Sequence, residues 1–453
     1  MENAKYFLLY LPNIIAKVYN AHMQLHSQKL RIRNKKFYDE IRGIKKEKIL
    51  GVAVDWSKSF HKVMVFDFSG KILVKPFEID TLRKGYDKLL KAVQKQERKI
   101  KAKKIFVVIE PSGSWAYSLI LNLGKDFEEL WLVNPYQTAS NRKEKMIIGL
   151  KTDDIDLCSL ADLLIRGECY KYVKEKEIYT QLKIRTYWRH NKIEMRTRLL
   201  NQICQRLGKV YPSVSVMQTG FRKVFDTAAF KCLMHLDKTP TEVLALGKER
   251  LKNILPTKAI NVRSRHASTI MTAFSKYLSP DDNIVKIELE ILKKDIRIYE
   301  AIEAEIKVIE DEMTKLVNYT EGKYLLNQIS GITDIMIASY IGIIGSVNKY
   351  ENAKKIFSLS GLAPKIKESG GKAIKGMGMI RKGNKYLGTL LFKMARCAIF
   401  NEPYFYAHFI KMRKKKNKPY RKSIASVAKK INNTLFAIIR DKKPFSAPAI
   451  SAG

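Results

Sequence analysis

The chain has 453 residues, too many for one ordinary hydrophobic core, so two or three domains are expected. Lys and Arg number 85 against 44 Asp and Glu, and the resulting net charge of +41 favours a polyanionic partner such as nucleic acid. Five scattered cysteines without a Cys-x-x-Cys pair argue against a zinc ribbon or a disulfide framework, and no apolar stretch is long enough to span a membrane. The composition therefore predicts a cytoplasmic protein that acts on nucleic acid and not at a membrane.

Residues 1–47 form a mixed apolar and basic leader, with a run of positive charge around residues 31–36. A docking helix and a loosely ordered arm fit this pattern equally well, so the role of the leader stays open.

Residues 48–175 are predicted to form a mixed α/β domain. Short apolar runs bounded by charged residues are typical of buried strands. They cover residues 49–55, 61–68, 71–76, 105–110 and 129–133. Helical spacing is present at residues 82–93 and 114–123. Three strands in succession, followed by strands that alternate with helices, give the order expected of a ribonuclease-H-like domain.

Four carboxylates in this domain form the candidate catalytic site. Asp55 and Glu110 each end an apolar strand, where a charge without compensation is costly. Asp153 and Asp156 are three residues apart at the start of a helical pattern, so both project from one helix face. Carboxylates in this layout are typical of a two-metal site for phosphoryl transfer, in which hard divalent cations hold the attacking and leaving oxygens.

Other roles for acids in this region stay open. Asp153 and Asp156 also suit the first turn of a helix, where negative charge stabilises the helix dipole, although Asp154 is the better candidate for that role. Asp67 is a rival ligand, and it ranks below the four because it lies at the end of a predicted hairpin.

Residues 176–320 are predicted to be a helical linker. The Arg-rich segment 187–207 suits a helix that faces nucleic acid, and a solvated helix face fits equally well. Residues 283–317 carry a near-heptad seam that favours a coiled coil or a two-helix hairpin, and a dimer contact, over an ordinary amphipathic helix. The seam residues are Leu292, Ile296, Tyr299, Ile302, Ile306, Ile309, Met313 and Leu316.

Residues 321–445 are predicted to form a second, mainly helical domain. The glycine turn in Ile329-Ser-Gly-Ile-Thr333 could offer backbone N–H groups to a phosphate. Ser369 lies in a polar, glycine-rich loop and is the candidate nucleophile, with Ser358 and Ser360 as alternatives. The basic block 411–422 is typical of a surface that follows a nucleic-acid backbone, and a solvated tail is the alternative.

Ten residues of this second domain are predicted to bind nucleic acid. The first three lie close enough to Ser369 in the sequence to neutralise a scissile phosphate. The set is Lys372, Arg381, Lys382, Asn384, Arg413, Lys414, Lys415, Lys416, Arg421 and Lys422.

In their order and spacing, the motifs of both domains resemble transposases of the insertion-sequence 110 family, including its 1111 subgroup. The resemblance covers roughly residues 48–440. The matching motifs in the first domain are Val54-Asp55-Trp-Ser-Lys58 with His61, Ile109-Glu110-Pro-Ser-Gly113, Asn134-Pro135 and Lys151-Thr-Asp-Asp-Ile-Asp156. Those in the second are Gly331-Ile332, Gly361-Leu-Ala-Pro364, Glu368-Ser-Gly-Gly371, Lys375-Gly376 and Lys382-Gly-Asn384 with Leu387.

The resemblance implies a DEDD recombinase with a RuvC-like N-terminal domain and a separate C-terminal transposase domain. It implies that Asp55, Glu110, Asp153 and Asp156 bind Mg²⁺ and that Ser369 forms a covalent phosphoserine link to DNA. It also implies a structured guide RNA, a dimer that pairs into a tetramer, and a prokaryotic, nucleoid-associated site of action.

Two residues depart from the family pattern. Leu157 replaces a small residue after the last Asp, and Gly388 replaces an Arg that commonly follows Leu387.

Two other functions fit the same residues. One is a RuvC-like nuclease that hydrolyses DNA or RNA with water, and the other is a non-catalytic nucleic-acid-binding protein. Metal-dependent cleavage separates both enzymes from the binding protein, and a covalent protein–DNA link separates the recombinase from the nuclease.

Overall fold

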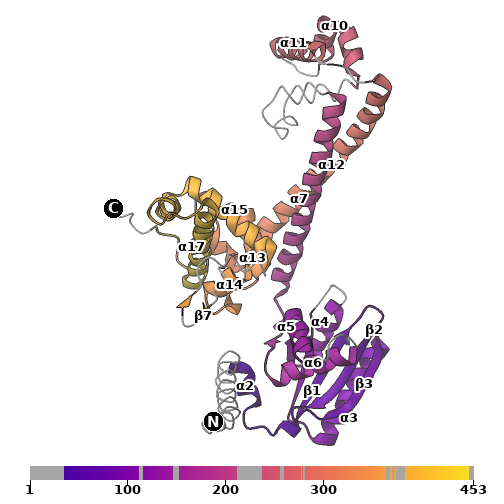
Figure 1. Cartoon of the computed structure of the whole chain (residues 1–453), viewed down its shortest axis with the longest axis vertical. Helices are drawn as coiled ribbons and strands as arrows, with labels where there is room; N and C mark the ends of the chain where they lie inside the picture. Colours follow the sequence, from indigo (N-terminus) through magenta and orange to yellow (C-terminus); the bar gives the residue numbers. More distant parts are fainter. Residues whose placement is uncertain are drawn as a thin grey trace, which may run out of the picture. The chain divides into compact units, whose positions relative to one another are not determined.

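The structure is a computed structural model of the chain. It describes residues 35–111, 116–145, 153–211, 237–255, 260–276, 278, 281–363, 368–369, 372–373 and 383–447. The chain divides into two compact units, Met1–Lys174 and Glu175–Gly453 (Figure 1).

The first unit is built on a six-stranded sheet with the strand order β3-β2-β1-β4-β5-β6. The strands are β1 (Ile49–Trp56), β2 (Phe60–Asp67), β3 (Ile72–Asp80), β4 (Lys104–Ile109), β5 (Glu129–Leu132) and β6 (Tyr170–Lys171). Strand β2 pairs antiparallel with both β1 and β3, whereas β1, β4 and β5 are parallel neighbours. The predicted mixed α/β sheet is confirmed.

Helices cover both faces of this sheet. They are α3 (Arg83–Ile100), α4 (Ala116–Asp126), α5 (Pro135–Lys145) and α6 (Asp153–Ile165). Successive residues of a strand point to opposite faces. In β1, Val52 and Val54 pack against α3 and α4, whereas Ala53 packs against α6. This alternation decides which polar side chains at the strand ends face α6.

The core of the first unit begins before residue 48. Helix α2 (Lys35–Ile41) places the ring of Phe37, which is fully buried, against Trp131 and Phe106, with ring centroids 5.0 and 5.6 Å away. The segment assigned to the leader from sequence therefore supplies a core side chain. Residues 1–34, with the basic run, lie outside the described residues.

The second unit contains a long antiparallel pair of helices, α7 (Glu177–Val210) and α12 (Asp282–Val317), which run side by side in Figure 1. Helices α10 (Pro240–Ile254) and α11 (Ile260–Lys276) pack together, and share a core with the adjoining ends of the pair. Among the seam residues of α12, Leu292, Ile306 and Met313 are buried within the chain. Helices α7 and α12 therefore form the predicted two-helix hairpin. The apolar seam of α12 packs against other helices of the same chain.

The C-terminal helices share one core with the base of this hairpin. They are α13 (Asp334–Ile344), α14 (Ala353–Leu359), α15 (Lys385–Asn401), α16 (Pro403–Ile410) and α17 (Tyr420–Asp441). Tyr179 and Leu182 of α7 and Met313 of α12 belong to the same apolar cluster as these helices. Strands β7 (Glu368–Ser369) and β8 (Lys372–Ala373) form a short antiparallel hairpin. The mainly helical C-terminal region is confirmed, and in the part of the chain described no helix is suited to spanning a membrane.

Candidate active site and nucleic-acid interface

Asp55 and Glu110 lie at the same edge of the sheet. Strands β1 and β4 are parallel, and Val54 is paired with Ile109, so each acid is the next residue along its chain. Ala53 and Val108 belong to the core on the α6 side, and continuing the alternation places both acids on that face. Both are partly buried. The sheet therefore brings these two predicted ligands to one edge and one face.

Helix α6 begins at Asp153 and packs on the same face of the sheet. Leu157 and Leu160 are buried in the core that also contains Ala53. Asp153 is exposed and Asp156 is partly buried in the first turn. Leu157, which departs from the family pattern, is thus a core residue of α6.

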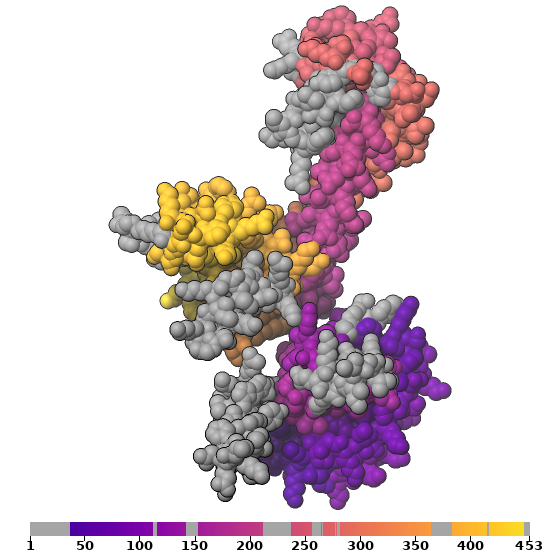
Figure 2. Space-filling model, in the orientation of Figure 1, coloured from indigo at the N-terminus to yellow at the C-terminus, as the bar shows by residue number. Residues whose placement is uncertain are grey.

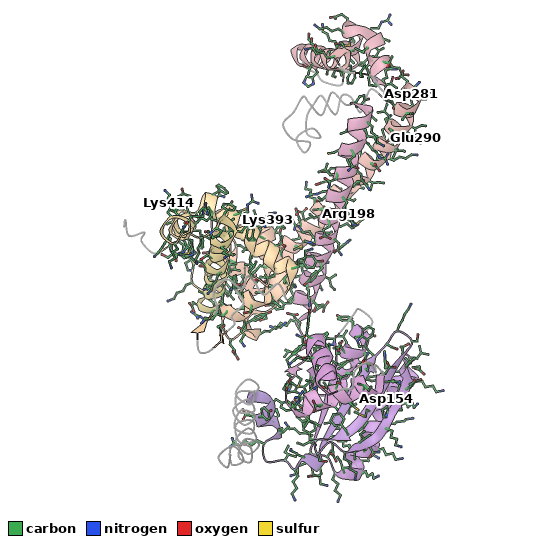
Figure 3. All side chains as sticks on the ribbon, viewed as in Figure 1. Asp154, Arg198, Asp281, Glu290, Lys393 and Lys414 are labelled. Carbon is green, nitrogen blue, oxygen red and sulfur yellow. The ribbon has the colours of Figure 1, made fainter. Side chains whose placement is uncertain are left out.

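Lys62 joins the strand edge to the start of α6. It is the cross-strand partner of Asp55 in the β1–β2 pairing. Its Nζ atom lies 3.3 Å from Asp154 Oδ1 and 3.6 Å from Asp153 Oδ2, and Asp154 is labelled in Figure 3. The hydrogen bond to Asp154, followed by the charges of both aspartates, raises the pKa of Lys62. Lys62 is not among the residues predicted from sequence, although the short connection between the first two predicted strands is a signal that could have placed it near Asp55.

The donor chemistry at this edge suits a hard divalent cation, which prefers carboxylate oxygens. Lys62 shows that positive charge is already accommodated beside Asp153. Within the described ranges, however, no three His, Cys, Asp or Glu side chains are grouped closely enough to hold an ion. The carboxylates are thus of the right chemical type for a metal, and they lie at one edge and on one face of the sheet. In this structure the cation that contacts Asp153 and Asp154 is the ammonium of Lys62.

Asp67, the rival ligand, has a role in the β2–β3 turn. Its Oδ1 atom accepts hydrogen bonds from the backbone N–H groups of Ser69 and Lys71, at 2.9 and 3.1 Å. The hydroxyl of Ser69 donates to the same oxygen at 2.5 Å. The carboxylate is buried and stabilises a tight turn at the other end of β2 from Lys62.

Ser369 and Lys372 face each other as backbone partners across the β7–β8 hairpin. Arg381 and Lys382 lie outside the described residues. The backbone N–H of Asn384 donates to the carbonyl of Leu359 at 2.6 Å, which holds the two ends of the segment bearing Ser369 together.

Two residues that the sequence singled out, Asn384 and Ser360, have structural roles at the same junction. The Asn384 side chain caps α15 by accepting from Leu387 N–H at 3.0 Å, and its amide N–H donates to Tyr187 Oη at 2.6 Å. Ser360, an alternative nucleophile, is buried, and its hydroxyl donates to Phe357 O at 2.6 Å. The side chains of Asn384 and Ser360 are thus both engaged within the fold.

Gly388 has a packing reason for lacking a side chain. A Cβ atom there would lie 2.6 Å from the carbonyl oxygen of Ser360, closer than van der Waals contact allows. The Arg of the family pattern therefore does not fit this junction without a backbone shift.

The glycine turn before α13 also has a packing role. Gly331 has φ +84°, and an added Cβ would lie 2.8 Å from the carbonyl oxygen of Cys397 in α15. The turn predicted to hold a phosphate is thus packed closely against another helix of the C-terminal core.

Positive charge without ion-pair partners gathers in the last helices. Residues 383–447 contain 16 Lys and Arg against two Asp and Glu, and the described ion pairs there are limited to Arg440 with Asp441. Among the predicted contacts in the basic block 411–422, those with described side chains are exposed: Arg413, Lys414 (labelled in Figure 3), Lys416, Arg421 and Lys422. The side chain of Lys415 lies outside the description. Burial, and then the charges of Lys430 and three other lysines, lower the pKa of His408 to about 4. The lysines thus add to the effect of burial on His408.

Four of the five arginines of α7 face carboxylates of α12 rather than an open surface. Six basic residues of α7 pair with acids of α12 along the length of the hairpin. The pairs are Arg185–Glu312, Arg189–Glu310, Lys192–Glu305, Arg196–Glu303, Arg206–Glu288 with Arg206–Asp295, and Lys209–Glu288. These contacts neutralise most of the basic residues of segment 187–207, whereas Arg198, labelled in Figure 3, is exposed and forms no ion pair with a described carboxylate.

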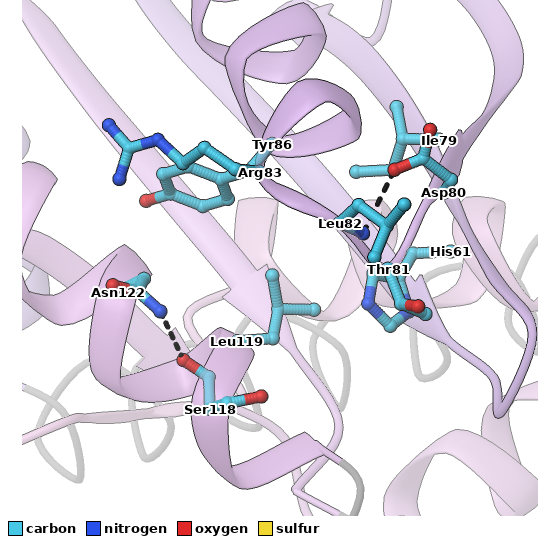
Figure 4. A pocket seen from close by; sticks show the side chains of 10 residues that line it. All are labelled: His61, Ile79, Asp80, Thr81, Leu82, Arg83, Tyr86, Ser118, Leu119 and Asn122. Carbon is cyan, nitrogen blue, oxygen red and sulfur yellow. Dashed lines mark hydrogen bonds between the residues drawn. The ribbon is translucent and has the colours of Figure 1, made fainter.

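A cavity of about 250 Å³ lies on the α3–α4 side of the sheet. Figure 4 shows His61 on one wall and Ser118, Leu119 and Asn122 of α4 on the other. Burial lowers the pKa of His61, whose Nδ1 accepts from Ser57 N–H at 3.4 Å. His61 therefore lies on the opposite face of the sheet from Asp55 and Lys62.

An α/β unit with carboxylates at one edge of its sheet, followed by a basic helical unit, is typical of an enzyme that acts on nucleic acid. Comparison with known proteins identifies the class as transposase. One family model, a DEDD transposase of the IS110 type, matches residues 52–212. A second, described as a transposase of the IS116/IS110/IS902 family, matches residues 323–409. The chain belongs to the IS110 family of transposases.

Known relatives agree with this assignment. The chain is 22% identical over 309 residues to the uncharacterized 44.8 kDa protein of insertion element IS116 from Streptomyces clavuligerus, covering 66% of this chain and 74% of the relative. It is 28% identical over 165 residues to the pilin gene-inverting protein of Moraxella lacunata, covering 36% of this chain and 48% of that protein. The pilin gene-inverting protein of Moraxella bovis is 27% identical over 144 residues, 31% of this chain and 45% of that protein. Membership implies an enzyme that binds, cleaves and recombines DNA, and a DEDD family suggests divalent-metal dependence.

Proposed function

We propose that the chain cleaves and exchanges DNA strands in a Mg²⁺-dependent reaction that passes through a covalent phosphoserine link at Ser369. The observation that carries this proposal is the placement of Asp55 and Glu110. Both acids lie at the ends of neighbouring parallel strands, on the face of the sheet against which α6 packs. A site that combines them with Asp153 and Asp156 of α6 requires this arrangement. The strand order, with three antiparallel strands followed by parallel β4 and β5, supports a RuvC-like, ribonuclease-H-like fold for the first unit.

The four carboxylates have assigned roles in this proposal. Asp55, Glu110, Asp153 and Asp156 would hold two Mg²⁺ ions, and bound Mg²⁺ would stabilise the negative charge that develops in phosphoryl transfer. Packing of α6 through Leu157 keeps the Asp153–Asp156 turn at the strand edge. In this proposal the four carboxylates orient the scissile phosphate.

Ser369 supplies the nucleophile. Its hydroxyl oxygen attacks phosphorus, the bond from phosphorus to one strand oxygen breaks, and that oxygen leaves with a proton while the serine proton passes to solvent. A free strand end then attacks the phosphoserine and restores the hydroxyl. Lys372, Arg381 and Lys382 neutralise the phosphate during both steps.

The partners follow from the family resemblance and the charge. A structured guide RNA selects donor and target DNA, and the protein acts on the nucleoid as a dimer that pairs into a tetramer. In that assembly the carboxylates of one subunit meet the serine of another.

The test is an adduct assay with purified protein, end-labelled donor DNA, Mg²⁺ and RNA transcribed from the DNA flanking the coding region. The native chain is expected to form a protein–DNA adduct that survives a denaturing gel. Ser369→Ala and Asp153→Ala are expected to abolish it. Cleavage without an adduct, unchanged in Ser369→Ala, would show a hydrolytic nuclease instead, and binding without any cleavage would show a non-catalytic protein.

A further inference from the structure

One face of α15 is a continuous basic surface that the predicted contacts do not include. Four residues at helical spacing point to solvent, and we call them the α15 basic face: Lys385, Thr389, Lys393 and Arg396. The opposite face of α15 is buried through Leu387, Leu391 and Met394. The exposed side is therefore fixed in orientation by the packing of the buried side.

The charges of this face are not neutralised within the described part of the chain. None of Lys385, Lys393 and Arg396 forms an ion pair with a described carboxylate, and α15 itself carries no acid. Helix α7 differs, because four of its five arginines are paired with carboxylates of α12. Figure 3 labels Lys393 on α15. Figure 2 shows the surface of α15 and the helices that follow it in orange and yellow.

The dimensions suit a regular array of phosphates. Eleven residues separate Lys385 from Arg396, which is about 16 Å along a helix axis. One strand of B-DNA advances about 3.4 Å along the duplex axis per phosphate. Because the strand also winds round the axis, successive phosphates are farther apart than this rise, and the three charges match about three phosphates of one strand.

The composition favours a duplex over a single strand. Proteins that hold single strands stack bases on aromatic side chains within a basic groove. On the α15 basic face a small side chain, Thr389, lies between the charges instead, and its hydroxyl donates to the carbonyl of Lys385 at 2.9 Å. The exposed Phe400, four residues after Arg396, continues this face at its far end, so the aromatic side chain does not lie between the charges.

We propose that the α15 basic face binds the phosphates of one strand of duplex DNA and so sets the distance between the duplex and the Ser369 hairpin. Asn384, the N-cap of α15, is tied to Leu359, and so to the base of the segment that bears Ser369. This positioning role rests on the proposed function of Ser369, whereas the binding itself does not.

The experiment measures binding without chemistry. The full chain carrying Ser369→Ala is titrated with a 30-base-pair duplex in EDTA at several salt concentrations from 50 to 200 mM. The variant Lys385→Gln, Lys393→Gln, Arg396→Gln is expected to reduce the slope of log affinity against log salt by about 2.7, since each lost phosphate contact removes about 0.9. A matched variant of three exposed lysines on α3, Lys84→Gln, Lys91→Gln and Lys95→Gln, is expected to leave the slope unchanged.

The outcomes separate this inference from the proposed function. An unchanged slope in the α15 variant overturns the inference, and so does an equal loss in both variants. A loss seen with a structured RNA or a single strand but not with the duplex overturns it as well. If the slope falls as expected while the adduct assay is negative, the duplex-binding face stands and the serine mechanism does not.

Discussion

The ammonium of Lys62 lies 3.3 Å from the carboxylate of Asp154 and links β2 to the first turn of α6. The same ammonium reaches Asp153 at 3.6 Å and is cross-strand from Asp55. Asp153 and Asp154, which repel each other, therefore share one positive side chain at the edge where a metal is proposed to bind.

Replacing Lys62 with Met is expected to make the first unit depend more on a divalent cation. In EDTA the variant should have a lower Tm than the native chain, because the aspartates lose their counter-charge. Added Mg²⁺ should raise the Tm more in the variant than in the native chain. Thermal unfolding with and without Mg²⁺ measures both effects. The exposed Lys75→Met is the control, and an equal Mg²⁺ response in all three proteins would count against a cation site here.

Gly388→Ala is expected to destabilise the second unit by about 1–3 kcal/mol, the usual cost of forcing extra volume into a packed site. The added Cβ would lie 2.6 Å from Ser360 O. Urea unfolding measures the change. Gly208→Ala is the matched control, because a Cβ there meets nothing within 4 Å, and removing a helical glycine should stabilise by about 0.5–1 kcal/mol. If the free energy of unfolding of Gly388→Ala equals that of the native chain, the backbone around Ser360 moves to accept the methyl group at little cost.

Phe37→Ala is expected to cost about 3–5 kcal/mol, as for other buried aromatic truncations. Phe37 is fully buried against Trp131, so tryptophan fluorescence during urea unfolding reports on its surroundings. Phe60→Ala, at a side chain that is 36% exposed, should change stability by only about 0.5 kcal/mol. Equal effects of the two substitutions would mean that α2 is not part of the core in solution.

Glu288→Gln is expected to lower the Tm at neutral pH and to have no effect in acid. Hydrogen bonds from Lys209, and then Arg206, lower the pKa of Glu288. A carboxylate with a depressed pKa stabilises the fold above its unfolded pKa of about 4.3, and this stability is lost as the pH falls through the folded value. Melting curves from pH 7 to pH 3 should therefore converge for native and variant chains. Glu290→Gln, at an exposed i,i+4 pair with Lys294, should show a smaller difference throughout.

The strand-end acids could be predicted because each depends on a local pattern. An apolar run that ends in an acid identifies Asp55 and Glu110, and the period of two along a strand gives their face once the sheet order is known. The structure confirms that their two strands are parallel neighbours. The start of α6 at Asp153 also agrees with the helical spacing seen in the sequence.

Contacts between distant residues could not be predicted in the same way. Arg185 and its partner Glu312 are 127 residues apart, so α7 alone looks like a helix with free positive charge. Lys62 and Asp154 are 92 residues apart. A single helix or strand shows which face is charged but not which element will neutralise it.

The third strand was predicted too short for a local reason. The sequence analysis ended it at Pro76, whereas β3 continues to Asp80. The register between β2 and β3 shifts there, with Val63 opposite Phe77 and Val65 opposite Val74. Proline is tolerated at such irregularities and on edge strands, and β3 is the edge of this sheet.

The ion pairs between α7 and α12 restrict how this hairpin can change length during evolution. Each pair joins residues that meet only in one antiparallel register, as Arg189 meets Glu310 and Arg196 meets Glu303. An insertion of one residue in α12 alone would rotate the following carboxylates by about 100° away from their partners. Insertion of seven residues in both helices would restore the faces and move α10 and α11 outward by about 10 Å. Homologous hairpins should therefore differ in length by paired heptads.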